Sequence, residues 1–331
     1  MFRFSPWVLA LALSLAAALP SAARSRPMVQ ADGACALGES LQPNKPRAQP
    51  VRGRAIWIWE TAFLEDARQV DEVLSFARRQ GAHTLFLYAP VWRLEQQPET
   101  IRCFLAEAHQ KQFTVHALQG EPRWIYDSHR ARAEEFLEAL ERFQQDRPAH
   151  LRFDAIHFDV EPQSLSEWRA ESIPELSRFY LDFLRWSRSR ARQLGLPLAV
   201  DVPPWYRNLE NDSGTLLDAV LEIADEVALM AYVDESWRIV LDSLPAISRA
   251  ERSGKGVWIG LSADPLHLPR LPAGRSLRRE LEKMRGRVEK AFPQQHSFRG
   301  VAIHDLVLYQ RLLCEADCAA SRTVAGAGAG Q

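Results

Sequence analysis

The amino-acid sequence predicts a single (β/α)₈ barrel, on the basis of two observations. Short apolar runs alternate with longer amphipathic segments along residues 54–313, which indicates parallel strands connected by helices. Eight such runs fall within this stretch, whose length is close to the roughly 250 residues typical of closed barrels. An open, doubly wound sheet is the competing fold, but no glycine-rich phosphate turn follows the first run.

The expected strands are the eight apolar runs: Ala55–Trp59, Thr84–Ala89, Phe113–Leu118, Phe153–Val160, Leu198–Val202, Glu226–Tyr232, Val257–Leu261 and Gly300–His304. Several segments between them carry apolar residues at helical spacing, with charged residues on the opposite face. The clearest are Leu64–Arg79, Ala133–Gln145, Ile173–Leu194 and Ser276–Phe292. Asp212-Ser213 offers an N-terminal cap for a further helix.

The two ends of the chain differ in composition from the barrel. Residues 1–23 combine a basic start, an apolar run and small residues up to Ala23, which is the pattern of a signal peptide; an uncleaved anchor is the alternative. Residues 24–53 are Pro-rich and polar, and we expect a linker or an ordered wrap over the domain. Residues 314–331 hold a cysteine pair and a tail that is expected to be disordered. No later apolar run reaches ~18 residues, so we expect no membrane span after signal cleavage and a periplasmic or secreted protein.

The charge and the cysteine content of the chain limit the binding partners, disulfides and metal sites that can be expected. The chain has 41 basic and 42 acidic residues and a net charge of -1, which gives no overall field to attract nucleic acid or an anionic membrane. We expect a monomer without nucleic-acid partners. Export permits disulfides, and the four cysteines allow three full pairings among Cys35, Cys103, Cys314 and Cys318. The sequence does not select one. No Cys-x-x-Cys pair occurs, and we expect neither a metal nor a cofactor.

The residues that end the apolar runs are the candidates for a site, because active sites of this fold lie at the C-terminal ends of the strands. These residues are rich in carboxylates and aromatic rings, which suits a polysaccharide or other glycan substrate. The expected substrate contacts are Trp57, Trp59, Tyr88, Glu121, Asp201, Trp205, Met230, Asp234 and His304.

The fourth run carries the most informative pattern. Side chains of a strand alternate between its faces, so His157, Asp159 and Glu161 point the same way. That direction is the barrel interior, because Phe158 and Val160 are the apolar residues that face the helices. Crowded carboxyl groups raise one another's pKa, which would keep Glu161 protonated as a general acid.

This run resembles the fourth-strand signature Asp-x-x-Asp-x-Asp-x-Glu of glycoside hydrolase family 18, the chitinase-like barrels. Asp154, Asp159 and Glu161 occupy its first, third and last positions, and His157 stands at the second, where the family usually has Asp. A weaker match is the family's Met-x-Tyr-Asp motif, which here has one extra residue and consists of Met230, Tyr232 and Asp234. His304 stands where the family usually has a Trp that forms the floor of the sugar site.

The resemblance implies a role for each matched residue. Glu161 would protonate the glycosidic oxygen and then act as the base for water. Asp159 would hold the substrate's acetamido group, whose carbonyl is the nucleophile, and Tyr232 would donate a hydrogen bond to the resulting intermediate. His157 would adjust the charge of Asp159. Trp57, Trp59 or Trp205 would take the place of the missing Trp.

Three alternatives remain open from the sequence. A retaining glycosidase with two catalytic carboxylates is one, although the seventh run offers no terminal Glu. A metal-dependent hydrolase or deacetylase is another, with ligands drawn from His116, His157, Asp159, Glu161 and His304. The third is a non-catalytic glycan-binding barrel, which would keep Trp57, Trp59 and Trp205.

Overall fold

In the computed structural model, residues 26–30, 35, 52–211, 214–270 and 276–314 are described. Eight parallel strands among them close into a barrel in the order β1-β10-β9-β8-β5-β4-β3-β2. These strands are β1 (Gly53–Ile58), β2 (Ala82–Tyr88), β3 (Thr114–Gln119), β4 (Ala155–Phe158), β5 (Leu198–Val202), β8 (Glu226–Met230), β9 (Gly256–Ser262) and β10 (Phe298–His304). Every expected apolar run forms a strand, and the (β/α)₈ class is confirmed. A two-stranded hairpin, β6 (Glu210–Asn211) and β7 (Gly214–Thr215), is separate from the barrel sheet.

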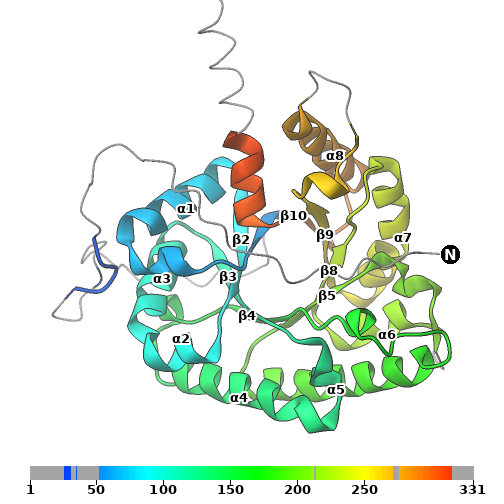
Figure 1. The fold of residues 1–331 in the computed structure, drawn as a ribbon, viewed down its shortest axis with the longest axis horizontal. Coiled ribbons are helices and arrows are strands. Elements are labelled where there is room, and N and C mark those ends of the chain that lie inside the picture. Colours follow the sequence, from blue (N-terminus) through cyan, green and yellow to red (C-terminus); the bar gives the residue numbers. More distant parts are fainter. Residues whose placement is uncertain (1–25, 31–34, 36–51, 212–213, 271–275, 315–331) are drawn as a thin grey trace, which may run out of the picture.

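The helices form a ring around the central strands (Figure 1). They are α1 (Ala67–Arg79), α2 (Val91–Gln96), α3 (Pro98–Gln110), α4 (Asp127–Gln144), α5 (Ile173–Gln193), α6 (Leu216–Ile223), α7 (Ser236–Ser253) and α8 (Leu277–Ala291). Residues 306–314 are also helical. Short 3₁₀ turns follow several strands, among them η2 (Pro122–Ile125), η4 (Pro162–Ser164) and η5 (Pro204–Asn208).

Local capping explains where two helices begin. The expected helix from Leu64 is shorter, because Asp66 accepts a hydrogen bond from the Arg68 amide at 3.0 Å and starts α1 at Ala67. Helix α6 begins after Thr215, whose side chain forms a capping box with Asp218. The expected cap at Asp212-Ser213 lies outside the described residues.

The barrel interior is filled by side chains from alternate strand positions. Trp57, Phe86 and Trp258 form its apolar centre together with Leu118 and small alanines. Outward-facing Phe158 packs instead against the helix layer, where its ring lies 5.5 to 6.0 Å from three other rings, those of Trp124, Phe136 and Phe183. His157, the preceding residue, is fully buried inside the barrel. The predicted alternation along the fourth strand is therefore confirmed.

The described part of the segment before the barrel is attached to it. Met28 is buried in the main core, and its amide donates to the Glu65 carbonyl at 3.1 Å. Cys35 forms a disulfide with Cys103 of α3, so the three possible pairings reduce to the one that contains this bond. Cys314 is exposed and unpaired among the described residues, and Cys318 lies outside them. The described residues of this segment are therefore held against the domain by a hydrogen bond and a disulfide.

We expect the Cys35–Cys103 bond to contribute strongly to stability, because it closes a loop of 68 residues in the unfolded chain. Replacing both cysteines with Ser should lower the free energy of unfolding by about 3 kcal/mol. Urea unfolding of the oxidised protein and the double variant measures this difference. Reductant should destabilise the parent protein by a similar amount and leave the double variant unchanged. Equal stability of the two proteins would contradict the expectation.

No helix within the described residues is long and apolar enough to cross a bilayer. The expected signal peptide, residues 1–23, and the tail, residues 315–331, lie outside the described part of the chain.

Candidate functional site

Two acidic residues lie just beyond the C-terminal end of β4. The Asp159 amide donates to the Gln119 carbonyl at 3.0 Å, which extends the pairing with β3 past the strand end. Gly120 permits this approach, because a Cβ atom there would lie 1.9 Å from the Asp159 carbonyl oxygen. The Glu161 carbonyl accepts from the Ser164 amide at 3.0 Å, at the turn η4. The backbone on both sides of the two carboxyl groups is thus fixed by hydrogen bonds.

A third carboxyl group, that of Asp201, is buried beside them at the end of β5, with 2% of its surface exposed. Its Oδ2 accepts from Trp57 Nε1 at 3.0 Å, and its Oδ1 lies 2.9 Å from His157 Nε2. Burial lowers the pKa of His157 to about 3, so the imidazole is neutral at neutral pH. When Asp201 is ionised it only accepts, and His157 then carries its hydrogen on Nε2 and donates it.

Asp201 and Trp57 therefore differ from their expected roles. Trp57 is 1% exposed, so it offers no ring face to a sugar, and the buried Asp201 cannot reach a substrate. The prediction that they contact substrate is wrong. Their hydrogen bond places them beneath the site instead. His157 also differs in its partner, since it contacts Asp201 of the neighbouring strand rather than Asp159.

The carboxyl groups share one electrostatic environment. Burial raises the pKa of Asp201 well above its ordinary value. Burial also raises the pKa of Asp159 and that of Glu161, and the Asp201 charge raises both further. The Asp201 charge thus acts on both other groups, and the Glu161 charge also raises the pKa of Asp159. The predicted effect of crowding on Glu161 is present in the structure, with the charge supplied from β5.

A polar chain holds the Glu161 side chain. Gln163 Nε2 donates to Glu161 Oε2 at 2.7 Å, and Tyr206 Oη donates to Gln163 Oε1 at 2.6 Å. The contact with Gln163 lowers the pKa of Glu161 and opposes the effects of burial and of Asp201. Sequence reasoning assigned no role to Gln163 or Tyr206, although each follows the end of a barrel strand. Their role becomes visible only in the structure, where a hydrogen bond joins the two residues across 43 positions of sequence.

Replacing Gln163 with Leu should raise the pKa of Glu161, because the lost hydrogen bond favours the charged carboxylate. Carbon-13 NMR titration of the Glu side-chain carboxyl groups measures this pKa. The matched control is Ser166→Ala, which removes a nearby exposed hydroxyl bonded to Glu167. A Glu161 pKa that stays constant or falls in Gln163→Leu would show that the hydrogen bond does not stabilise the carboxylate.

Aromatic side chains flank the carboxyl groups on two sides. On one side Trp59 Nε1 donates to His304 Nε2 at 3.1 Å, and the Trp59 ring lies 5.7 Å from that of Tyr88. The Tyr232 ring lies 5.4 Å from His304. These four residues come from the ends of β1, β2 and β10 and from the loop after β8. In the barrel order, β1 and β10 lie opposite β5 and β4, whereas β8 is the neighbour of β5.

The second aromatic group belongs to the loops after β4 and β5. Trp168 lies stacked on Tyr206 at 6.2 Å, and Trp205 packs edge-on against Tyr206 at 5.0 Å. Trp205 is 40% exposed, so its ring is available to a ligand. Trp205 and the half-buried Trp59 thus remain candidates for sugar stacking where Trp57 does not.

The other residues predicted for the site lie at different positions relative to the carboxyl groups. Tyr232 is close enough to the acids that their charges add to burial in raising the pKa of its hydroxyl, which keeps it protonated. Met230 ends β8 and is half-buried, and Asp234 is exposed in the following loop. Glu121 caps the turn η2 by accepting from the Arg123 amide at 3.2 Å. Asp154 lies at the opposite end of β4, where it accepts from the Val115 amide at 2.7 Å.

Among the described residues, no three His, Cys, Asp or Glu side chains are grouped so that they could hold a metal ion. The ligand set of the metal-dependent alternative is dispersed, with His116 and His157 in the interior and His304 bonded to Trp59.

Comparisons with known proteins find similarity in the barrel structure but not in the amino-acid sequence. No family model matches the chain, and no curated protein matches it. A GH18 chitinase from Pseudoalteromonas aurantia is 13% identical, with a TM-score of 0.51 over 76% of this chain and 93% of the chitinase. A chitinase from Chromobacterium violaceum is 12% identical, with a TM-score of 0.49 over 78% of this chain and 98% of that one. At these identities the likeness shows the fold alone: the chain has the (β/α)₈ barrel that the chitinase from P. aurantia also has.

Proposed function

We propose that this protein is an exported glycoside hydrolase that cleaves an N-acetylhexosamine-containing glycan, with Glu161 as general acid and base. The observation that carries the proposal is the pairing of Glu161 with Asp159 at the C-terminal end of β4, between two groups of aromatic side chains. The fourth-strand motif supports it, as does the similar barrel of the chitinase from P. aurantia. The disulfide supports export, because such bonds persist in oxidising compartments.

In the first step, Glu161 donates its proton to the glycosidic oxygen. Its raised pKa favours the protonated form that this step needs. Asp159 Oδ1 is buried and has no hydrogen-bond partner among the described atoms, and it would accept the N–H of the acetamido group. The acetamido carbonyl oxygen then bonds to the anomeric carbon as the glycosidic C–O bond breaks. The leaving sugar takes the proton as an alcohol.

In the second step, water replaces the acetamido oxygen. The Glu161 carboxylate takes a proton from the water while the water oxygen bonds to the anomeric carbon. The bond to the acetamido oxygen breaks and the acetamido group is restored. The protonated Tyr232 hydroxyl donates a hydrogen bond to the acetamido oxygen between the two steps. Both proton transfers thus use one residue, and Glu161 returns to its starting state.

A comparison of two substrates tests this function. Oligomers of N-acetylglucosamine should be hydrolysed, whereas glucosamine oligomers of the same length should react at least about 100-fold more slowly, because the internal nucleophile is absent. Reducing-end assays measure both rates. Equal rates would exclude substrate assistance. Binding of the glycan without hydrolysis would support the glycan-binding alternative and overturn the proposal.

A further inference from the structure

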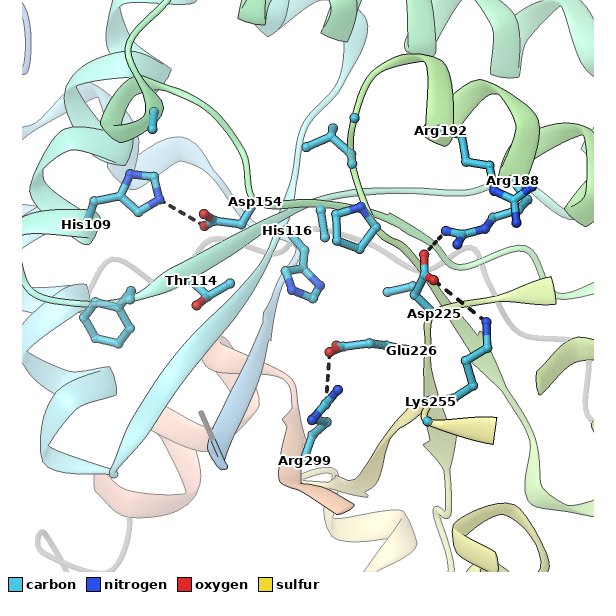
Figure 2. A pocket seen from close by; sticks show the side chains of 18 of the residues that line it. His109, Thr114, His116, Asp154, Arg188, Arg192, Asp225, Glu226, Lys255 and Arg299 are labelled. Atoms are coloured by element: carbon cyan, nitrogen blue, oxygen red, sulfur yellow. Dashed lines mark hydrogen bonds and ion pairs between the residues drawn. The ribbon is translucent and has the colours of Figure 1, made fainter. Parts of the chain in front are cut away.

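A cavity of about 1050 Å³ lies at the other end of the barrel (Figure 2). Its lining includes the first residues of three strands, Thr114 of β3, Ala155 of β4 and Glu226 of β8. Asp159 and Glu161 follow the opposite end of β4, so this cavity is separate from the proposed hydrolytic site. None of its residues has a part in the proposed reaction.

One carboxylate in this cavity, that of Asp225, interacts with two basic side chains. Asp225 contacts Arg188, lies 3.8 Å from Lys255 Nζ, and also accepts from the Leu198 amide at 2.9 Å. Figure 2 shows Arg188 reaching the Asp225 carboxylate from the upper right and Lys255 from the lower right, with Arg192 beside Arg188. Arg192 has no acidic partner among the described residues. Burial lowers the pKa of both Arg188 and Lys255, and repulsion from Arg192 lowers both further.

The other acids of the cavity are occupied and do not balance this charge. Glu226 accepts from Arg299 at 3.1 Å and from the Trp258 indole at 2.9 Å. Asp154 accepts from the Val115 amide at 2.7 Å, and its Oδ2 lies 3.0 Å from His109 Nε2. The positive charge around Arg188, Arg192 and Lys255 is therefore left in excess.

Two buried polar atoms in the cavity lining also have no partner among the described residues. They are Nε of Arg188, which is a donor, and Nδ1 of His116. His116 is only 4% exposed and lies at the inner wall of the cavity (Figure 2). A buried polar atom without a hydrogen bond is costly. A bound ligand or ordered water would satisfy both atoms.

We propose that this cavity binds a phosphate group, either free or carried on a small molecule. Arginine side chains pair with phosphate oxygens through two parallel N–H donors, and lysine adds a compact charge. Arg188, Arg192 and Lys255 supply these groups, and His116 supplies a polar contact deeper in the cavity. The volume is at the upper end of the roughly 300–1000 Å³ of small-molecule sites, so it has room for a phosphorylated metabolite.

Titration calorimetry at low ionic strength tests the proposal with inorganic phosphate, glucose 6-phosphate and citrate. Arg192→Gln is the informative variant, because this exposed residue carries no ion pair that the fold needs among the described residues. Arg178→Gln is the matched control, an exposed arginine of the same helix that pairs with Glu175 at 3.6 Å. We expect saturable phosphate binding that weakens at least tenfold in Arg192→Gln and is unchanged in Arg178→Gln.

Tighter binding of glucose 6-phosphate than of inorganic phosphate would assign the site to phosphorylated small molecules, and the reverse would assign it to the free ion. Phosphate should also raise the melting temperature of the parent protein and of Arg178→Gln, but less that of Arg192→Gln. The absence of saturable phosphate binding, equal affinities in the three proteins, or binding of citrate alone would each overturn the proposal. Hydrolysis at the opposite end should be the same in all three proteins.

Discussion

Glu161→Gln should reduce the rate of glycan hydrolysis by about a thousandfold or more. Gln keeps the size and the hydrogen-bonding capacity of the side chain but can neither donate an acidic proton nor accept one from water. General acid–base catalysis contributes roughly 10²–10⁴-fold, and here one residue performs both transfers. Steady-state hydrolysis of N-acetylglucosamine oligomers by the two proteins measures the loss.

The leaving group distinguishes an acid from a merely structural residue. A dinitrophenyl glycoside needs no protonation to depart, so its first step should survive in Glu161→Gln far better than that of a natural oligomer. Glu167→Gln, a change at an exposed acid of the following loop, is the control and should leave both substrates unaffected. Equal losses on the two substrates would mean that Glu161 does not act as the acid in the first step.

Asp201→Asn should move the alkaline limb of the activity profile to lower pH. The Asp201 charge raises the pKa of Glu161, so its removal lowers that pKa and the acid is deprotonated earlier as pH rises. Above the new pKa, each unit of downward shift reduces the protonated fraction about tenfold. Profiles of kcat/KM against pH for the parent and the variant measure the shift. A limb that stays in place, or moves upward, would contradict the role of Asp201.

The same substitution should stabilise the fold at neutral pH. A carboxyl group whose pKa is raised by folding binds its proton more tightly in the folded state. Its contribution therefore becomes unfavourable as pH rises from the unfolded pKa, about 4, through the folded pKa. The amide that replaces the carboxyl group can still accept from Trp57 and can donate to the other tautomer of His157. The melting temperature should be higher in Asp201→Asn at pH 7, and this difference should shrink below pH 4.

The sequence was a good guide to the fold because the barrel depends on a repeated pattern. Apolar runs contribute alternate side chains to one shared interior, and a chain with eight such runs separated by helices has few folds open to it other than a barrel. Helix α3 was not among the helices singled out. Its residues from Ile101 to Ala108 are buried almost all round, so it lacks a polar face, and the disulfide to Cys35 adds a cover that no periodicity reveals.

The site was only partly predictable, because its electrostatics depend on contacts between strands. The motif located Asp159 and Glu161, and alternation located His157 inside the barrel. Asp201 and Trp57 also end apolar runs, yet their hydrogen bond joins β1 to β5 across 144 positions. Strand position alone cannot distinguish a side chain that faces solvent from one that is buried below it. The same holds for the contact between Gln163 and Tyr206.

Product analysis in ¹⁸O-labelled water tests the central claim most directly. The purified parent protein and Glu161→Gln are incubated with N-acetylglucosamine oligomers and peptidoglycan, and new reducing ends are read by mass spectrometry. The parent protein is predicted to release shorter glycans whose new reducing-end sugar carries the label, and Glu161→Gln to release almost none. No labelled product from any of these glycans, or undiminished labelling by Glu161→Gln, would contradict the assignment of Glu161 as the acid and base of a glycoside hydrolase.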